Sequence, residues 1–221
     1  MDKNLAKARR GLFRGLSRNI RSESVIRVME QVSRELFVPV ESRHMAYVDF
    51  PLSIGEGQTI SQPYIVAMMA AALELRGSER VLEVGTGSGY QAAILSGLVP
   101  NGRVVTVELI PMLAQRAQAL LRDLGYSNVT VELAGDVLGC PELGPFDAII
   151  VAAAAPKLPE SLVSQLAVGG RLVVPVGTRE QQELVQAHRT DEGLSVRMLG
   201  PCRFVPLIGR EAFPRPSPRS T

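Results

Sequence analysis

Residues 81–90 read VLEVGTGSGY, an apolar run followed by glycines at positions 85, 87 and 89. The run is short and rich in Val and Leu, which is typical of a strand buried in a parallel sheet. Alternating glycines allow a tight turn and let a ligand approach the main chain. The segment therefore predicts a strand, a glycine loop and, over residues 90–98, a helix. A glycine loop with a purely structural role stays open as the alternative.

Strand and helix patterns alternate through the central part of the chain. Such alternation favours parallel pairing through right-handed crossovers, so we expect an α/β fold with a doubly wound, mostly parallel, Rossmann-like sheet. Two late segments, 182–189 and 194–199, alternate like strands and extend the sheet, with antiparallel pairing open to them. The central elements are predicted as strands over 80–84, 102–108, 129–133, 146–151 and 170–176, and as helices over 112–124 and 159–166.

The N-terminal part combines helical patterns with a loop. Apolar residues recur at helical spacing from Ser22 to Val38, where Ser22 or Ser24 would cap the helix and Pro39 would end it. Residues 46–61 are rich in Gly, Pro, Ser and Thr and predict a loop, and residues 64–75 suit a helix. The basic residues near the N-terminus are interpreted as a solvated helix face.

The domain organisation follows from these patterns. We expect one domain over 1–213, made of N-terminal helices and loop (1–78), a central core (79–177) and C-terminal strands (178–213). The Pro- and Arg-containing tail, 214–221, lacks apolar residues and is predicted to be disordered.

Acidic residues follow the second and third central strands. Glu108 ends the second strand about twenty residues after the glycines, where a carboxylate binds ribose hydroxyls in nucleotide-binding folds. Asp136 follows the third strand and is placed to bond an adenine amine, although a plain turn aspartate is the alternative. The GxGxG spacing differs from the GxGxxG of dinucleotide sites, which favours S-adenosyl-L-methionine, a cofactor without a pyrophosphate. We therefore expect an S-adenosyl-L-methionine-dependent methyltransferase.

The acceptor site is expected in residues 54–63, IGEGQTISQP. Ser61 lies beside a predicted helix start, where main-chain N–H groups and the helix dipole favour an anion such as a carboxylate. A simple N-cap role for Ser61 is an equally open alternative. His44 and His188 accompany no GxSxG motif and are interpreted as structural or surface residues.

Composition excludes several other classes. A net charge of +2 gives no electrostatic case for nucleic-acid binding. Cys140 and Cys202 form no metal-ligand pattern, so no metal is expected, and two reduced thiols are favoured over one disulfide. No signal peptide or membrane-spanning run is visible, which predicts a cytoplasmic protein without membrane partners, taken as a monomer by default.

Seven segments, in order, resemble the signature of the protein-L-isoaspartate O-methyltransferase family, across about residues 20–213. They lie before, within and after the central core. They read ELFVP (35–39), AYVDFPL (46–52), GQTISQP (57–63), FDAIIV (146–151), AAAP (153–156), GGRLVVPVG (169–177) and FVPL (204–207).

The resemblance implies methyl transfer from S-adenosyl-L-methionine to the α-carboxyl group of L-isoaspartyl residues in damaged proteins and peptides. It implies that Ser61 is the active-site serine and that Val205 and Pro206 lie along the substrate backbone. The residues implied for the cofactor are Thr59, Ile60, Gly85, Gly87, Ser88, Gly89, Glu108, Leu109, Asp136 and Val137.

Departures from the family pattern keep other functions open. Val137 stands where the family has Gly, and Lys157 stands where it has an acid. These changes leave room for a carboxyl methyltransferase with another peptide or protein target. A non-catalytic cofactor-binding module is a further alternative, against which the intact glycine loop, Glu108 and Ser61 argue.

Overall fold

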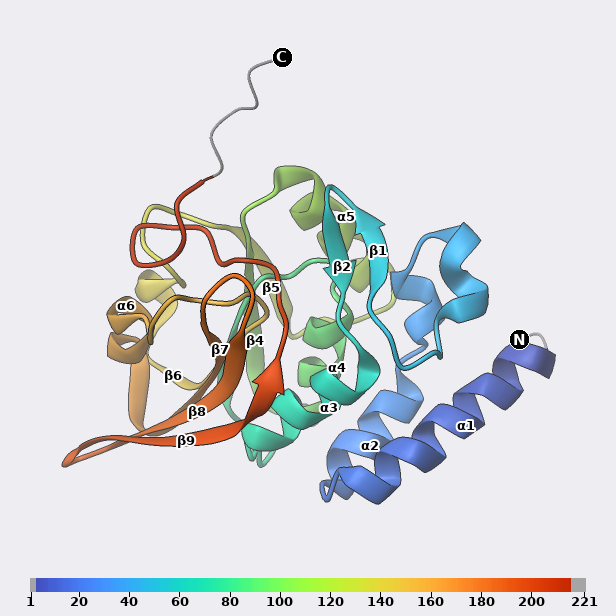
Figure 1. The fold of residues 1–221 in the computed structure, drawn as a ribbon, viewed down its shortest axis with the longest axis horizontal. Coiled ribbons are helices and arrows are strands. Elements are labelled where there is room, and N and C mark those ends of the chain that lie inside the picture. The colour runs from blue at the N-terminus through green and yellow to red at the C-terminus, as the bar shows by residue number, and fades with distance from the viewer. Residues whose placement is uncertain (1–2, 216–221) are drawn as a thin grey trace, which may run out of the picture.

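A seven-stranded sheet forms the centre of the protein in a computed structural model that describes residues 3–215 (Figure 1). The strand order is β5-β4-β3-β6-β7-β8-β9. The first five strands of this order pair in parallel, and β8 and β9 add to the edge by antiparallel pairing. The predicted fold class and the late strands are thus confirmed. The strands are β3 Arg80–Val84, β4 Arg103–Glu108, β5 Val129–Leu133, β6 Phe146–Val151, β7 Leu166–Gly177, β8 Gln182–Thr190 and β9 Gly193–Cys202.

Helices cover both faces of this sheet because its central strands are apolar on both sides. On one face, Val81 and Ile150 pack against Met69 of α3 (Pro63–Ala72) and Leu95 of α4 (Tyr90–Leu98). The other face packs against Leu162 and the returning C-terminal segment. The remaining helical elements of the core are α5 Pro111–Asp123, η3 Pro141–Leu143 and α6 Glu160–Ser164.

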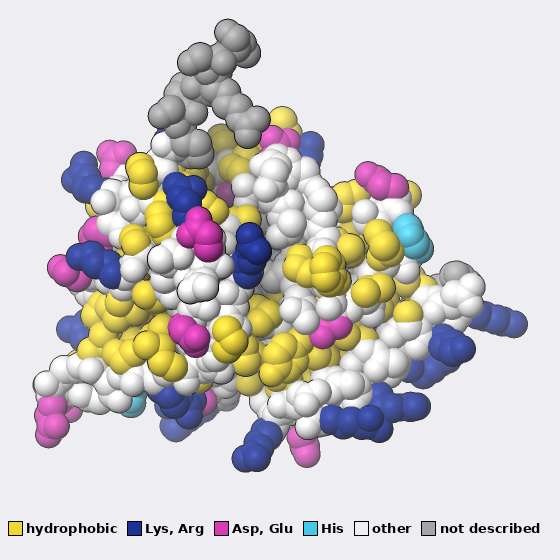
Figure 2. All heavy atoms as spheres, viewed as in Figure 1, with side chains coloured by type: hydrophobic (Ala, Val, Ile, Leu, Met, Phe, Trp, Pro, Cys, Tyr) yellow, Lys and Arg dark blue, Asp and Glu magenta, His cyan; other side chains and the backbone are white. Residues whose placement is uncertain are grey.

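The N-terminal helices pack side by side beyond α4. Helix α1, Lys3–Asn19, buries Phe13 and Leu16, and its outer face carries a row of Lys and Arg side chains (Figure 2). This row is the solvated face that the sequence predicts. Helix α2, Glu23–Gln31, ends well before Val38, so the long predicted helix is wrong there. The chain extends at Val32, and residues 34–37 and 40–45 form the 3-10 helices η1 and η2.

A β-hairpin replaces part of the loop predicted over 46–61. Strands β1, Leu52–Gly55, and β2, Gln58–Ile60, pair antiparallel around Glu56 and Gly57, which both have positive φ. Such a two-residue turn matches the twist of the flanking strands. Apolar side chains at alternate positions of this hairpin are buried, and they are Leu52, Ile54 and Ile60.

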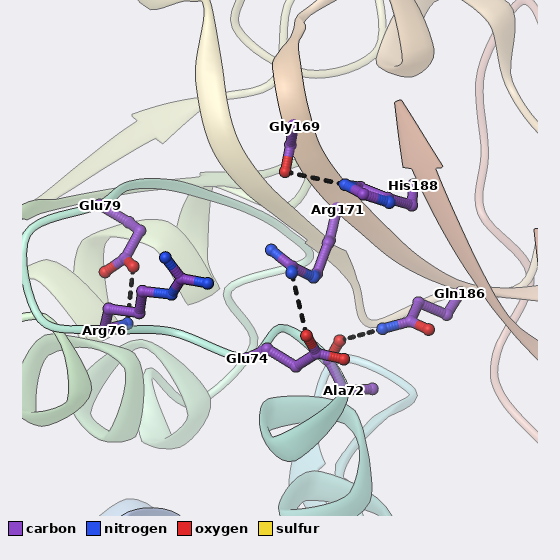
Figure 3. Close-up of polar contacts among 8 residues, drawn as sticks. All are labelled: Ala72, Glu74, Arg76, Glu79, Gly169, Arg171, Gln186 and His188. Carbon is purple, nitrogen blue, oxygen red and sulfur yellow. Dashed lines mark hydrogen bonds and ion pairs between the residues drawn. The ribbon is translucent and has the colours of Figure 1, made fainter. Parts of the chain in front are cut away.

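Polar contacts tie the end of α3 to the sheet (Figure 3). Gln186 donates a hydrogen bond to the carbonyl of Ala72 over 2.5 Å, and Arg171 pairs with Glu74 over 2.9 Å. Nε2 of His188 lies 3.2 Å from the carbonyl of Gly169, which agrees with the prediction that this histidine is a structural or surface residue. Both cysteines are free thiols.

The part of the predicted tail at 216–221 lies outside the described residues. Within residues 3–215, no helix is both long and apolar enough to cross a membrane.

Candidate functional site

The glycine loop turns over the carboxyl ends of β3 and β4. The N–H groups of Gly85 and Thr86 both donate to the carbonyl of Val107, over 2.9 and 3.2 Å. Gly85 and Gly87 have φ values of 99° and 54°, which favour glycine. A Cβ on Gly85 would lie 3.4 Å from that of Ala152, at the end of β6. The loop thus packs against two neighbouring strands and presents its main chain to the space above them.

Glu108 faces this loop from the end of β4. Its side chain is buried, and its two oxygens accept separate main-chain hydrogen bonds, from Gly87 over 2.8 Å and from Ile110 over 3.0 Å. These bonds hold the carboxylate in one orientation. Because each carboxylate oxygen has two acceptor positions, both oxygens keep capacity for a hydroxyl donor.

A single pocket brings together the predicted site residues from segments far apart in the sequence. Its members come from the hairpin, the glycine loop, the ends of β4 and β5 and the C-terminal segment. The predicted residues that line it are Thr59, Ile60, Ser61, Gly85, Gly87, Ser88, Glu108, Leu109, Asp136, Val137, Val205 and Pro206.

Gly89 is the exception among the predicted residues. It does not line the pocket, and a Cβ there would lie 3.2 Å from Leu121 Cδ1 of α5. Gly89 is the N-cap of α4, and its φ of 85° lies in the left-handed region. The third glycine of the motif therefore serves close helix packing, and its contact with a cofactor stays a prediction.

Glu83 is a pocket residue that the sequence analysis did not assign. It is fully buried in β3, and its Oε2 accepts a hydrogen bond from Thr106 over 2.6 Å. Its Oε1 and the nearby Nε2 of Gln91 form no hydrogen bond of normal geometry with any of residues 3–215. Burial raises the pKa of Glu83 to about 8. A glutamate within an apolar parallel strand is unusual, and that was the available signal.

Ser61 lies between β2 and α3, but it is not the N-cap of α3. Gln62 occupies that position, and its own side chain does not cap the helix. The carboxylate of Asp49 instead accepts hydrogen bonds from the N–H of Tyr64 over 2.8 Å and from the side chain of Gln62 over 3.0 Å. The N-cap alternative for Ser61 is therefore wrong. Asp49 also occupies the helix N-terminus at which we expected the acceptor anion.

The C-terminal segment closes the other side of the pocket. Ala154, just after β6, donates to the carbonyl of Val205 over 2.8 Å and accepts from the N–H of Leu207 over 2.7 Å. This pairing fixes Val205 and Pro206 beside the segment that follows β6. Two chain segments, the hairpin and residues 205–209, thus border the space above the glycine loop.

Comparison with known proteins identifies the family of this chain. The sequence profile of the family Protein-L-isoaspartate(D-aspartate) O-methyltransferase matches residues 9–212. The chain belongs to this family. Protein-L-isoaspartate O-methyltransferase 1 of Syntrophobacter fumaroxidans is 51% identical over 195 residues, covering 88% of this chain and 90% of the relative. The Protein-L-isoaspartate O-methyltransferase of Ignicoccus hospitalis is 52% identical over 194 residues, covering 87% and 92%.

Solved structures show the same family. A protein-L-isoaspartate O-methyltransferase superposes with a TM-score of 0.82 at 29% identity, covering 92% of this chain and 67% of that one. A Plasmodium falciparum β-aspartate methyltransferase of the family, in complex with S-adenosyl-L-homocysteine, superposes with a TM-score of 0.78 at 27% identity, covering 89% and 96%.

The two departures from the family pattern differ in their positions. Val137 lines the pocket and is half exposed there. Lys157 does not line the pocket, and its exposed ammonium group lies 3.7 Å from the carboxylate of Glu160. The reversed charge at position 157 is therefore a surface feature, and of these two departures Val137 is the one that lines the pocket.

Proposed function

We propose that this enzyme transfers the methyl group of S-adenosyl-L-methionine to the α-carboxylate of L-isoaspartyl residues in damaged proteins and peptides. The observation that carries the proposal is the shared pocket. The glycine loop and Glu108 lie in the same pocket as Ser61 and the segment at Val205. Family membership names the acceptor chemistry, and the pocket would hold the donor and the acceptor side by side.

The polar groups of the pocket suit the donor. Glu108 would accept hydrogen bonds from the ribose hydroxyls, because its oxygens keep free acceptor capacity beside Gly87. Asp136 and Val137 would border the adenine. Oε1 of Glu83 would meet the cationic amino acid end, whose positive charge would favour the ionised carboxylate over the protonated form that burial favours in the free protein. Thr59, Ile60, Ser88 and Leu109 would complete the donor site.

The reaction needs little from the protein beyond positioning. When bound, the donor supplies a methyl group on a sulfonium centre, which is already electrophilic. An acceptor carboxylate is ionised at neutral pH, so no general base is required. The carboxylate oxygen forms the new C–O bond as the methyl–sulfur bond breaks and its electron pair remains on sulfur. Ser61 would hold the carboxylate by donating a hydrogen bond, and the hairpin would exclude water.

Substitution of Ser61 tests this assignment. Ser61→Ala should keep its fold and its affinity for S-adenosyl-L-homocysteine but lose about 100-fold in kcat, because a misplaced acceptor reacts slowly. Transfer of a labelled methyl group to an isoaspartyl peptide measures this loss. Ser53→Ala, an exposed change in the same hairpin, is the matched control.

A second test compares the isoaspartyl peptide with its normal aspartyl isomer as substrates of the parent enzyme. The normal aspartyl isomer should remain unmethylated under the same conditions. Equal labelling of both isomers would favour the alternative of a carboxyl methyltransferase with another target. Undiminished turnover of Ser61→Ala would contradict the role given to this serine.

The setting of the reaction is also part of the proposal. The partners are damaged proteins and peptides that contain isoaspartate. The two free thiols agree with a reducing compartment, and we place the enzyme in the cytoplasm.

A further inference from the structure

Arg34 is a buried cation that has no carboxylate in ion-pair contact among residues 3–215, although the carboxylate of Asp49 attracts it from a longer distance. It lies in η1 with none of its surface exposed. Its Nη1 forms no hydrogen bond of normal geometry within this described part of the chain. Burying a charge is costly unless it is paired, so packing alone does not explain an arginine at this position.

The guanidinium group joins three chain segments, and two of them line the pocket. Its Nε donates to the carbonyl of Ala46 over 2.9 Å, and its Nη2 donates to the carbonyl of Ser61 over 2.8 Å. Its Cζ lies 4.8 Å from the ring centroid of Tyr90, which begins α4 immediately after the glycine loop. A planar group with donors at fixed angles can hold two carbonyls at once, whereas a lysine ammonium cannot reproduce that geometry.

The contact with Ser61 links Arg34 to the acceptor side of the pocket. Ser61 and Tyr90 both line the pocket, but Arg34 itself does not. The hydrogen bond to the Ser61 carbonyl fixes the peptide plane that follows this residue, and so limits the directions open to its side chain. A positive charge inside the protein also acts on a nearby anion more strongly than a surface charge, because water does not screen it.

We propose that Arg34 is a positioning residue that orients Ser61 and that its buried charge favours binding of the isoaspartyl carboxylate. This inference rests on the proposed function. It assigns two separable properties to one side chain. The two-carbonyl bridge should affect kcat, because it sets the direction of Ser61, and the charge should affect KM for the peptide.

Two substitutions separate these properties. Arg34→Lys keeps the charge and breaks the bridge, so kcat should fall about 10-fold while KM for the peptide stays within about two-fold of the parent. Arg34→Met removes both, so kcat should fall similarly and KM should also rise about 10-fold. Arg43→Met removes an exposed charge from the neighbouring η2 and serves as the control, with parent kinetics expected.

Cofactor affinity separates a positioning role for Arg34 from a merely structural one, because general disruption of the pocket would weaken cofactor binding as well. The dissociation constant of S-adenosyl-L-homocysteine, measured by calorimetry on the folded variants, should stay within about two-fold of the parent for both Arg34 substitutions. Unchanged kcat and KM, once corrected for the folded fraction, would overturn the inference. So would a loss of cofactor affinity as large as the loss of turnover, because that result means general disruption of the pocket.

Activity of the parent enzyme separates failure of the proposed function from failure of the inference about Arg34. Absence of isoaspartyl methylation by the parent would overturn the proposed function and this inference with it. Parent methylation with unaltered Arg34 variants would overturn the inference alone. If Arg34→Met does not fold, Arg34→Lys still decides the matter through its kcat.

Discussion

Glu83→Gln exchanges a buried carboxyl group for a neutral amide of the same shape. The hydrogen bond from Thr106 can persist, because the amide oxygen also accepts. In the parent, burial raises the pKa of Glu83 from its ordinary value of 4.5 to about 8. A carboxyl group with a raised pKa stabilises the fold fully at pH values below 4.5, and this contribution disappears as the pH rises through about 8.

The size of this effect follows from proton linkage. Between pH 6 and pH 8 the folded parent retains a proton that the unfolded chain has lost. Over this interval the free energy of unfolding of the parent should therefore fall by about 2 kcal/mol relative to that of Glu83→Gln. All other groups titrate alike in both proteins, so their contributions cancel in the difference.

Urea unfolding at pH 6, 7 and 8 measures the difference directly. Glu132→Gln makes the same chemical change at an exposed position of β5, and its curve should run parallel to that of the parent. Parallel curves for the parent and Glu83→Gln would refute the reasoning, since Glu83 would then have the same pKa in both states.

Other substitutions test other parts of the site. Glu108→Gln should weaken S-adenosyl-L-homocysteine binding about 10-fold in calorimetry, because the carboxylate loses charge-assisted hydrogen bonds. Gly89→Ala should lower the free energy of unfolding in urea by about 1–3 kcal/mol through its positive φ and its contact with Leu121, yet leave cofactor affinity of the folded protein unchanged. Lys157→Glu should change KM for an isoaspartyl peptide less than about two-fold, because its ion pair is exposed. A large shift in KM would instead place residue 157 at the acceptor site.

The core elements were predictable because their signals are local. The strands over 129–133 and 146–151 and the helix over 90–98 have the predicted bounds. Buried parallel strands read as continuous apolar runs, and the glycines and prolines between them mark the turns. The sequence did not decide how β8 and β9 pair, because a strand's alternation of apolar and polar residues is the same for parallel and antiparallel pairing. The structure shows that both pair antiparallel.

The N-terminal part was less predictable because distant contacts decide its conformation. The helical spacing of apolar residues runs to Val38, but the chain leaves the helix after Gln31 and Arg34 enters the core. Two of the hydrogen bonds of Arg34 go to carbonyls 12 and 27 residues away. The hairpin at 52–60 was hidden by its Gly and Ser content, although its alternating apolar residues were a usable signal.

By itself, the sequence determined the α/β class, the family and most of the residues that line the pocket. These depend on patterns within short segments and on motifs in a set order. The tertiary structure alone decided what each polar group does there. It directed Gly89 to helix packing, placed Asp49 at the start of α3 and buried Glu83 and Arg34 beside the pocket. These outcomes depend on which distant groups become neighbours and how completely water is excluded, and no local pattern encodes either.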